Sequence, residues 1–162
     1  MSTFEPGFMQ RAIDLSKKGS IAHPGGPAGG PFGAVIVRDG RIIGEGYNRV
    51  LADIDPTAHA EIVAIRHACQ TVKSLVLDRA AMYASCQPCP MCLGAIMWSR
   101  LEAVFYVNTA DDARRIGFDD AEFYRELALP EAERRLSQRR VDFPDALNVF
   151  EQWLNSPNRR QY

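Results

Sequence analysis

His59-Ala60-Glu61 and the later Pro88-Cys89-Pro90-Met91-Cys92 are the stretches that decide what fold this chain can have. Each motif opens a segment whose residues favour a helix. Cys89 and Cys92 are three residues apart, so one helical turn places both thiols on the same side of a helix. The free N–H groups and partial positive charge of a helix N-terminus favour thiolate over thiol. The spacing therefore predicts a metal site built from two helix starts.

Two thiolates and one imidazole supply three of the four ligands of a tetrahedral zinc site. The fourth position would then hold water, and zinc lowers the pKa of bound water towards about 7. Glu61 lies two residues after His59, at the same helix start. We expect it to take the proton of that water and pass it to a substrate nitrogen. Glu61 should not itself bind the metal, because a fourth protein ligand would close the site.

The spacing of these cysteines is also compatible with other roles. Cys86 could close a purely structural zinc site, and a lone C-x-x-C pair could be a redox centre. The spacing of Cys86, Cys89 and Cys92 also resembles the start of an iron–sulfur motif. That motif needs a further cysteine three residues later, where this chain has Ile96. His67 is more typical of a helix surface than of a metal ligand.

The segments around the two motifs indicate alternating strands and helices. Residues 33–38 and 41–48 predict a hairpin about the turn Asp39-Gly40, and 81–85 and 103–107 predict two more strands. A weak strand pattern occurs at 140–143. We expect helices over 5–18, 59–70, 90–98, 121–127 and 146–154. Helices between apolar strands imply crossover connections and a mixed sheet in one α/β domain that spans residues 1–162.

The sequence also predicts the start and the buried face of the helix over 59–70. Asp55-Pro56-Thr57 has the composition of a helix start, with a capping side chain and an early proline. The apolar residues of the helix predict the buried face, which would comprise Ile62, Val63, Ile65 and Cys69. The glycine- and proline-rich residues 19–33 predict a loop. This loop is either a linker or, since it feeds a strand, a contributor to the site.

Composition excludes several classes of protein. The chain has 162 residues, 46% hydrophobic and 24% charged, which is globular composition with enough length for a core. Its net charge of −1 gives no global attraction to nucleic acid or to anionic membranes. No apolar run is as long as a membrane span, and the N-terminal residues lack the pattern of a secretory signal. We therefore expect a cytoplasmic protein with reduced cysteines and no membrane contact.

The order H-x-E…P-C-x-x-C resembles the signature of zinc-dependent nucleobase deaminases. The chain is similar over almost its whole length to the cytidine-deaminase-like superfamily, and most similar to its small bacterial guanine deaminases. The stretches that carry this resemblance are PFGAVIV, DGRIIGEGYNRV, DPTAHAEIVAIR, SCQPCPMCLGAIMW and GFDDAEFYREL. The resemblance implies a three-layer αβα sandwich with a central five-stranded mixed sheet. It also implies one Zn²⁺ per subunit, held by His59, Cys89 and Cys92.

The resemblance further implies a set of substrate contacts. Asn48 resembles the residue whose amide reads the purine edge, and Phe32 the aromatic residue that packs on the base. Ala60, within the zinc motif, is also expected to contact the substrate. Asp120 resembles an acidic group near the guanine amino group, although spacing alone does not separate it from Asp119. Tyr162 resembles a terminal tyrosine that closes the pocket. Some of these residues have a plainer alternative: a strand end for Asn48, core packing for Phe32, and helix capping for the aspartates.

The activity implied is hydrolytic deamination of guanine, a small-molecule purine, to xanthine and ammonia. Water would attack C2, and either Glu61 or Asp120 would protonate the departing amine. Similar enzymes form homodimers that exchange the C-terminal segment, which would place Tyr162 at the partner's site.

The same motifs are compatible with three other functions. One is a transfer-RNA adenosine deaminase, another is a deaminase of a small ring such as ammeline, isocytosine or guanosine, and the third is a non-catalytic zinc module. Binding to nucleic acid needs a basic surface, but acidic neighbours dilute the cluster Arg134, Arg135, Arg139 and Arg140. Glu61 argues against a purely structural site, because such a site has no use for it.

Overall fold

The computed structural model describes residues 3–21 and 26–161, in two compact units that comprise residues 1–125 and 126–162. The first unit contains a mixed sheet of four strands, β1 (Gly33–Arg38), β2 (Arg41–Tyr47), β3 (Ala80–Cys86) and β4 (Ala103–Asn108). The order is β2-β1-β3-β4. β1 is antiparallel to both of its neighbours, whereas β3 and β4 are parallel. The α/β class and the mixed sheet predicted from the sequence are therefore confirmed.

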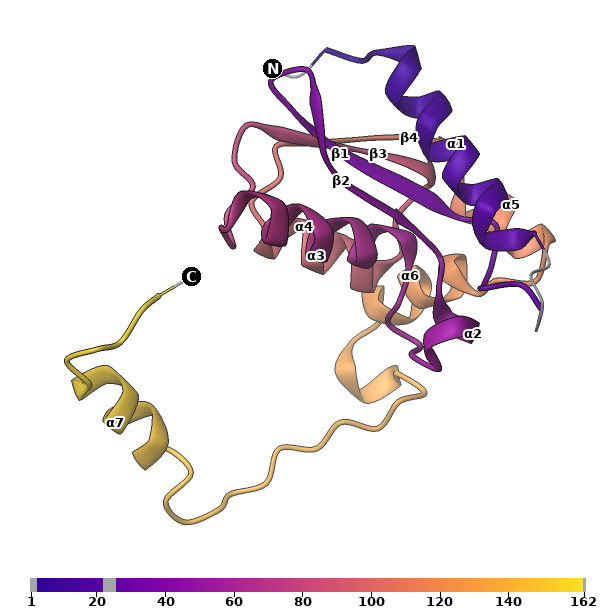
Figure 1. The fold of residues 1–162 in the computed structure, drawn as a ribbon. Helices are drawn as coiled ribbons and strands as arrows, with labels where there is room; N and C mark the ends of the chain where they lie inside the picture. Colours follow the sequence, from indigo (N-terminus) through magenta and orange to yellow (C-terminus); the bar gives the residue numbers. More distant parts are fainter. Residues whose placement is uncertain (1–2, 22–25, 162) are drawn as a thin grey trace. The chain divides into compact units, whose positions relative to one another are not determined.

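Helices cover both faces of this sheet (Figure 1). On one face α1 (Pro6–Ser20) packs Met9, Ala12 and Leu15 against Val35 of β1 and Tyr83 of β3. The opposite face packs against α3 (Ala60–Val72) and α4 (Pro90–Trp98). Successive residues of β1 point to opposite faces, and both faces are buried, which explains the continuous apolar sequence of this strand.

Small residues, not the large apolar ones, form the buried face of α3. Ala60, Ala64 and Ala68 are fully buried, whereas Ile62, Val63, Ile65 and Cys69 are only partly buried. Glycines in β2 explain the difference. A Cβ on Gly46 would lie 2.2 Å from the Ala60 carbonyl oxygen, and one on Gly44 would lie 2.4 Å from the Ala64 carbonyl oxygen. The helix thus lies so close to β2 that only small side chains fit between them. The sequence expectation for this face is therefore confirmed only in part: Ile65 and Cys69 pack against the core, but the alanines that it omitted are the residues that are fully buried.

We expect Gly46→Ala to destabilise the first unit. The added methyl group would meet backbone atoms of α3, which cannot move as the end of a flexible side chain can, so overpacking should cost about 1–3 kcal/mol. Urea unfolding of the zinc-loaded protein measures this cost. Gly7→Ala is the matched control, because nothing lies within 4 Å of a Cβ at that position. Equal unfolding midpoints for the two variants would contradict the close approach of α3 to β2.

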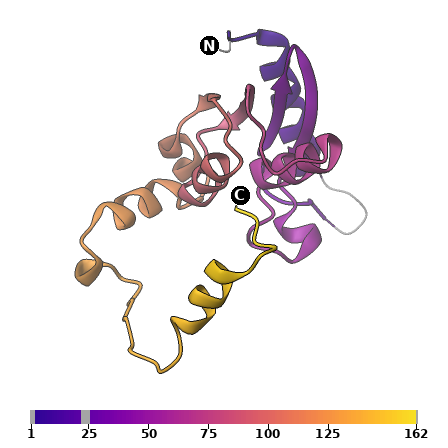
Figure 2. The same ribbon diagram turned by 90° about the vertical axis from the view of Figure 1, so that its left-hand side faces the viewer.

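Two further expectations need correction. The sheet has four strands among the described residues, not five, because residues 134–143 have no regular structure and their unit contains no strand to pair with (Figure 2). Asp55-Pro56-Thr57 does not begin α3. The Asp55 carboxylate instead accepts hydrogen bonds from the backbone N–H and hydroxyl of Thr57, which closes a turn before the helix.

The remaining helices are short. They are α2 (Val50–Asp53), α5 (Ala110–Arg115), α6 (Asp120–Ala128), the 3-10 helix η1 (Glu131–Glu133) and α7 (Asn148–Asn155). α2 and α5 were not anticipated from the sequence. In the second unit no residue from 126 to 161 is buried.

Candidate metal centre and substrate cavity

The three predicted metal ligands meet at the starts of α3 and α4. His59 is the N-cap residue of α3, and Cys89 is the N-cap residue of α4. Neither side chain caps its own helix, so both are free to turn towards the space between the two helices. Pro90 then occupies the first turn of α4, where a missing N–H costs nothing. Cys92 follows one turn into α4 and is fully buried.

The distances among these side chains fit one zinc ion. The Sγ atoms of Cys89 and Cys92 each lie 3.6 Å from Nδ1 of His59. Zinc–sulfur bonds of 2.3 Å and a zinc–nitrogen bond near 2.05 Å at a tetrahedral angle give a sulfur–nitrogen separation of about 3.5 Å. Among the described residues, these three form the group whose potential ligand atoms all lie within 4.8 Å of one another. The side chains therefore already stand at coordination spacing.

The protonation of the group also suits a metal. A hydrogen bond from the Cys92 thiol, supported by His59, lowers the pKa of Cys89 to about 4. The same hydrogen bond, together with burial, raises the pKa of Cys92. One thiolate is thus favoured at neutral pH, and the second thiol proton must leave when a metal binds.

Cys86 stands apart from this group. Its thiol donates to the carbonyl oxygen of Thr109, and burial raises its pKa to about 12. The structure therefore gives no support to a closed site that uses Cys86 as fourth ligand.

Glu61 lies beside the metal group without belonging to it. Its side chain is in the first turn of α3, is 7% exposed and lines the same cavity as His59 and Cys89. Burial raises the pKa of this carboxyl group to about 7. The structure thus places an ionisable oxygen next to the metal position.

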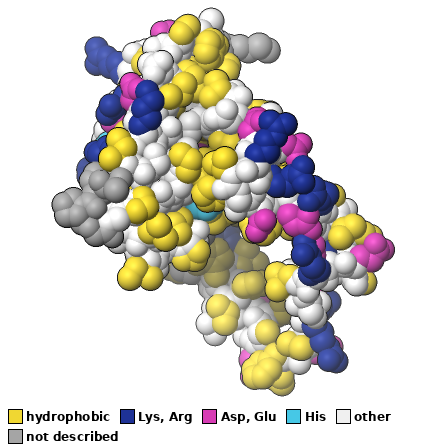
Figure 3. Space-filling model, turned by 90° about the vertical axis from the view of Figure 1, so that its right-hand side faces the viewer, with side chains coloured by type: hydrophobic (Ala, Val, Ile, Leu, Met, Phe, Trp, Pro, Cys, Tyr) yellow, Lys and Arg dark blue, Asp and Glu magenta, His cyan; other side chains and the backbone are white. Residues whose placement is uncertain are grey.

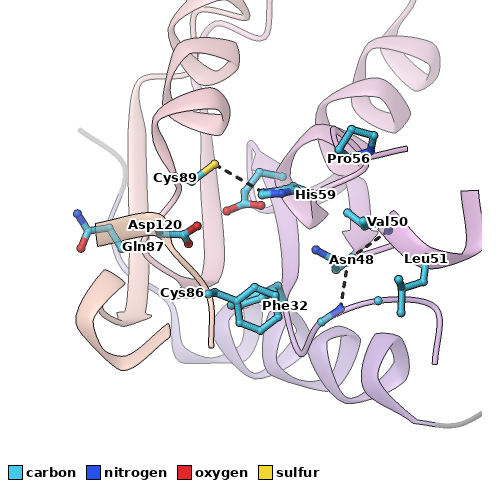
Figure 4. A pocket seen from close by; sticks show the side chains of 14 residues that line it. Phe32, Asn48, Val50, Leu51, Pro56, His59, Cys86, Gln87, Cys89 and Asp120 are labelled. Carbon is cyan, nitrogen blue, oxygen red and sulfur yellow. Dashed lines mark hydrogen bonds between the residues drawn. The ribbon is translucent and has the colours of Figure 1, made fainter. Parts of the chain in front are cut away.

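A cavity of about 480 Å³ opens over these residues (Figure 4). Side chains from several elements surround it, and Figure 4 shows His59, Asp120, Asn48 and Phe32 on its different sides. The residues that line it are Gly29, Gly30, Phe32, Asn48, Val50, Leu51, Pro56, His59, Glu61, Cys86, Gln87, Cys89, Phe118 and Asp120. A purine base fits easily in this volume, and the last residues of the glycine-rich loop contribute to the wall.

Asn48 offers hydrogen-bond donors to the cavity. It is buried, and its Oδ1 accepts hydrogen bonds from the backbone N–H groups of Gly30 and Val50, each at 3.2 Å. Its NH₂ group has no protein partner among the described residues and points into the cavity (Figure 4). A Cβ on Gly29 would lie 2.0 Å from Oδ1, so glycine is needed there for Asn48 to keep this orientation.

Phe32 and Asp120 line other sides of the cavity. The Phe32 ring packs edge-on against Phe118, with ring centroids 4.7 Å apart and an interplanar angle of 83°. Asp120 begins α6 and is half-buried, whereas Asp119 is exposed. Burial and the neighbouring Cys89 raise the pKa of Asp120. Of the two aspartates, the structure therefore places Asp120 at the cavity.

Two proposed substrate contacts are not brought into the cavity. Ala60 does not line it; its methyl group lies in the core, so any contact with a ligand would come from its backbone. Tyr162 lies outside the described residues.

Sequence reasoning missed several lining residues, among them Gln87, Phe118, Val50, Leu51 and Pro56. Phe118 and Gln87 lie within the quoted stretches GFDDAEFYREL and SCQPCPMCLGAIMW, beside residues assigned to the site, and this proximity was the available signal.

On the face drawn in Figure 3, Lys and Arg side chains are interspersed with Asp and Glu side chains. In the arginine cluster of the second unit, Arg135 pairs with Glu126, and Arg140 lies 3.8 Å from Asp142. These carboxylates offset part of the positive charge of the cluster, which weakens it as a surface for binding nucleic acid. Among the described residues, no helix has both the length and the apolar character needed to cross a membrane.

Comparison with known proteins identifies relatives over almost the whole chain. Residues 3–108 match the model of the cytidine and deoxycytidylate deaminase zinc-binding region. Guanine deaminase from Bacillus subtilis is 47% identical over 96% of this chain and 97% of its own length. An X-ray structure of guanine deaminase from Bacillus subtilis superposes with a TM-score of 0.89, at 46% identity, over 99% of both chains.

More distant relatives match only part of the chain. A transfer-RNA-specific adenosine deaminase from Haemophilus influenzae is 40% identical over 65% of this chain and 58% of its own length. A solved structure of a relative in complex with 2,6-diaminopurine has a TM-score of 0.64 and 31% identity, and covers 70% of this chain and 61% of that one.

Proposed function

Because the chain belongs to the cytidine and deoxycytidylate deaminase zinc-binding family, we propose that it hydrolyses guanine to xanthine and ammonia. The observation that carries this proposal is the near-complete match to a guanine deaminase, which extends beyond the family's zinc-binding region to 96% of this chain. The cavity adds chemical support, because its volume and its polar groups suit a purine base.

His59, Cys89 and Cys92 would hold the zinc ion. When bound, zinc supplies the Lewis-acid chemistry that makes water nucleophilic near neutral pH. Glu61 takes a proton from the attacking water and delivers it to N3 of the ring. This transfer needs a carboxyl group close to both the metal position and the substrate, and Glu61 lines the cavity beside His59 and Cys89.

The reaction balances with one water molecule. A bond forms between the water oxygen and C2 of guanine, and the bond between C2 and the exocyclic nitrogen breaks. The second proton of the water passes to the departing amine, which leaves as ammonia. Asp120, on the other side of the cavity from His59, hydrogen-bonds this amine, and either Asp120 or Glu61 delivers the proton.

The remaining cavity residues orient the base. The NH₂ group of Asn48 donates to the O6 and N7 edge of guanine, since both purine atoms are acceptors. Phe32, braced by Phe118, packs on the ring. The backbone of Ala60 and the side chain of Tyr162 complete the proposed substrate contacts.

We expect Asn48→Asp to raise KM for guanine by roughly 10- to 100-fold, the cost of losing one specific donor. The carboxylate can still accept from Gly30 and Val50, but it repels O6. Steady-state kinetics give the change in KM. 2,6-Diaminopurine supplies the matched comparison, because its 6-amino group donates where guanine accepts. Inhibition by this compound should therefore weaken less than guanine binding, and an equal loss for both ligands would contradict the assigned contact.

We also propose that the protein is a homodimer in which residues 126–162 of each subunit pack on the partner. The support is the apolar face of α7: Phe150, Trp153 and Leu154 are all at least half exposed, and an amphipathic helix of this kind needs a covering surface. Light scattering should give the mass of a dimer. Phe150→Glu combined with Trp153→Glu should give the mass of a monomer. A monomeric native protein at micromolar concentration would refute the proposal.

The assay that tests the activity follows xanthine formation from guanine by absorbance with the zinc-loaded protein. Guanosine, isocytosine, ammeline and a transfer-RNA anticodon stem are assayed beside it. We expect turnover of guanine with the highest kcat/KM of the set. No turnover of guanine by protein with a full zinc complement would overturn the assignment, and turnover of another substrate would replace it.

A further inference from the structure

The helix that carries Asp120 is weakly packed. α6 has no buried residue, and its first turn supplies the only carboxylate on that side of the cavity among the described residues. A short helix without buried side chains has little packing energy to fix its position. Something else must hold the Asp120 carboxylate at a constant distance from the metal group.

Tyr124 provides a direct link between α6 and the loop of the metal ligands. Its hydroxyl group donates a hydrogen bond of 2.6 Å to the carbonyl oxygen of Pro88, the residue that precedes Cys89. The loop that Tyr124 contacts is itself held in place. Oε1 of Gln87, the residue before Pro88, accepts a hydrogen bond from the backbone N–H of Ala110, at the start of α5. The Tyr124 hydroxyl is thus bonded to a ligand loop that is tied to α5.

The position of Tyr124 on α6 makes this link relevant to Asp120. The two residues are one helical turn apart, at positions i and i+4, so they lie on the same face of the helix. When Tyr124 is held against Pro88, the face that carries Asp120 is turned towards Cys89 and the cavity. Tyr124 is only partly buried, and this suits a residue whose contribution is a specific contact and not core packing.

We propose that Tyr124 is a positioning residue, which fixes Asp120 against the substrate amine through its hydrogen bond to Pro88. This inference rests on the guanine deaminase activity proposed above, and it assigns to that site a residue outside the metal motifs and the cavity wall. Tyr124 neither lines the cavity nor belongs to the group of metal ligands. It acts on the reaction through the placement of Asp120.

The test is a double-mutant cycle on the zinc-loaded protein, with kcat and KM measured for guanine. Tyr124→Phe keeps the ring and removes the hydroxyl, and should lower kcat/KM by about 10-fold, as expected for one lost hydrogen bond to a placed group. In the background of Asp120→Asn, the same change should alter kcat/KM by less than about 2-fold, because the group it positions is gone. Equal factors in the two backgrounds would overturn the proposal.

Zinc affinity separates this role from an effect on the ligand loop. Chelator competition should give the same zinc affinity for the native protein and for Tyr124→Phe. A loss of affinity that parallels the loss of kcat/KM would show that Tyr124 acts through Cys89, and this outcome would also overturn the proposal. Tyr106→Phe is the matched control, since that ring is 47% exposed on β4. Inactivity of the native protein on guanine would count against the proposed function, whereas an active native protein with an unaffected Tyr124→Phe variant would count against the inference alone.

Discussion

Replacement of Glu61 by glutamine is expected to lower kcat for guanine on the order of 10³-fold, the middle of the range for general acid–base catalysis, while zinc stays bound. Glutamine has nearly the same shape as glutamate, so the buried position in the first turn of α3 can accept it. Its amide cannot carry a proton from water to the ring. The measurements are the rate of xanthine formation and the zinc content of the same preparation.

The comparison of rate with zinc content decides what Glu61 does. Glu102→Gln is the control, because this exposed glutamate does not line the cavity. It should retain both rate and metal. If Glu61→Gln lost zinc and activity in parallel, Glu61 would be a ligand and the open coordination position would not exist. If it kept full activity, the proton would travel by another route.

The metal site was predictable because its geometry is local to two helix starts. His59 and Cys89 each stand immediately before a helix, and Cys92 follows after one turn. Short-range rules on helix ends and residue spacing therefore place all three once the helices are recognised. The remaining requirement, that the starts of α3 and α4 meet, follows from the crossover connections of a mixed sheet.

The parts that sequence reasoning missed depend on contacts between distant segments. The buried face of α3 is set by Gly44 and Gly46 of β2, so alanines occupy the interface that a hydrophobic pattern would assign to isoleucine and valine. Which of Asp119 and Asp120 faces the cavity depends on how α6 is oriented against the rest of its unit. The local sequence does not determine that orientation. The hydrogen bond between Tyr124 and Pro88 joins residues that no spacing rule connects.

The prediction of a five-stranded sheet was wrong for a different reason, because it added a strand that the described residues do not contain. The weak pattern at 140–143 alternates suitably for a strand, yet a strand is stable only with a partner, and its unit offers none among the described residues. The count of five strands came from the resemblance to the cytidine-deaminase-like superfamily. The local sequence alone does not show whether residues 140–143 have a strand to pair with.

Cys89→Ser is expected to abolish zinc binding at stoichiometric metal, and activity with it. Serine is a favoured N-cap residue, so the start of α4 should remain intact. Its hydroxyl group does not ionise at neutral pH, however, and a site reduced to two good ligands should lose on the order of 10³-fold or more in zinc affinity. The unfolding midpoint should also fall towards that of native protein treated with a chelator, because a metal that binds only the folded state stabilises it. Readdition of zinc should restore the chelated native protein but not the variant.

Cys86→Ser distinguishes loss of a ligand from loss of a nearby thiol. Cys86 lines the same cavity, but its thiol is bonded to the Thr109 carbonyl oxygen, a contact that a serine hydroxyl can replace. This variant should keep one zinc ion per subunit, measured by atomic absorption. Loss of zinc from Cys86→Ser would instead indicate a closed site with three thiolates. Such a site has no coordination position free for water, and the hydrolytic role of the metal would then have to be abandoned.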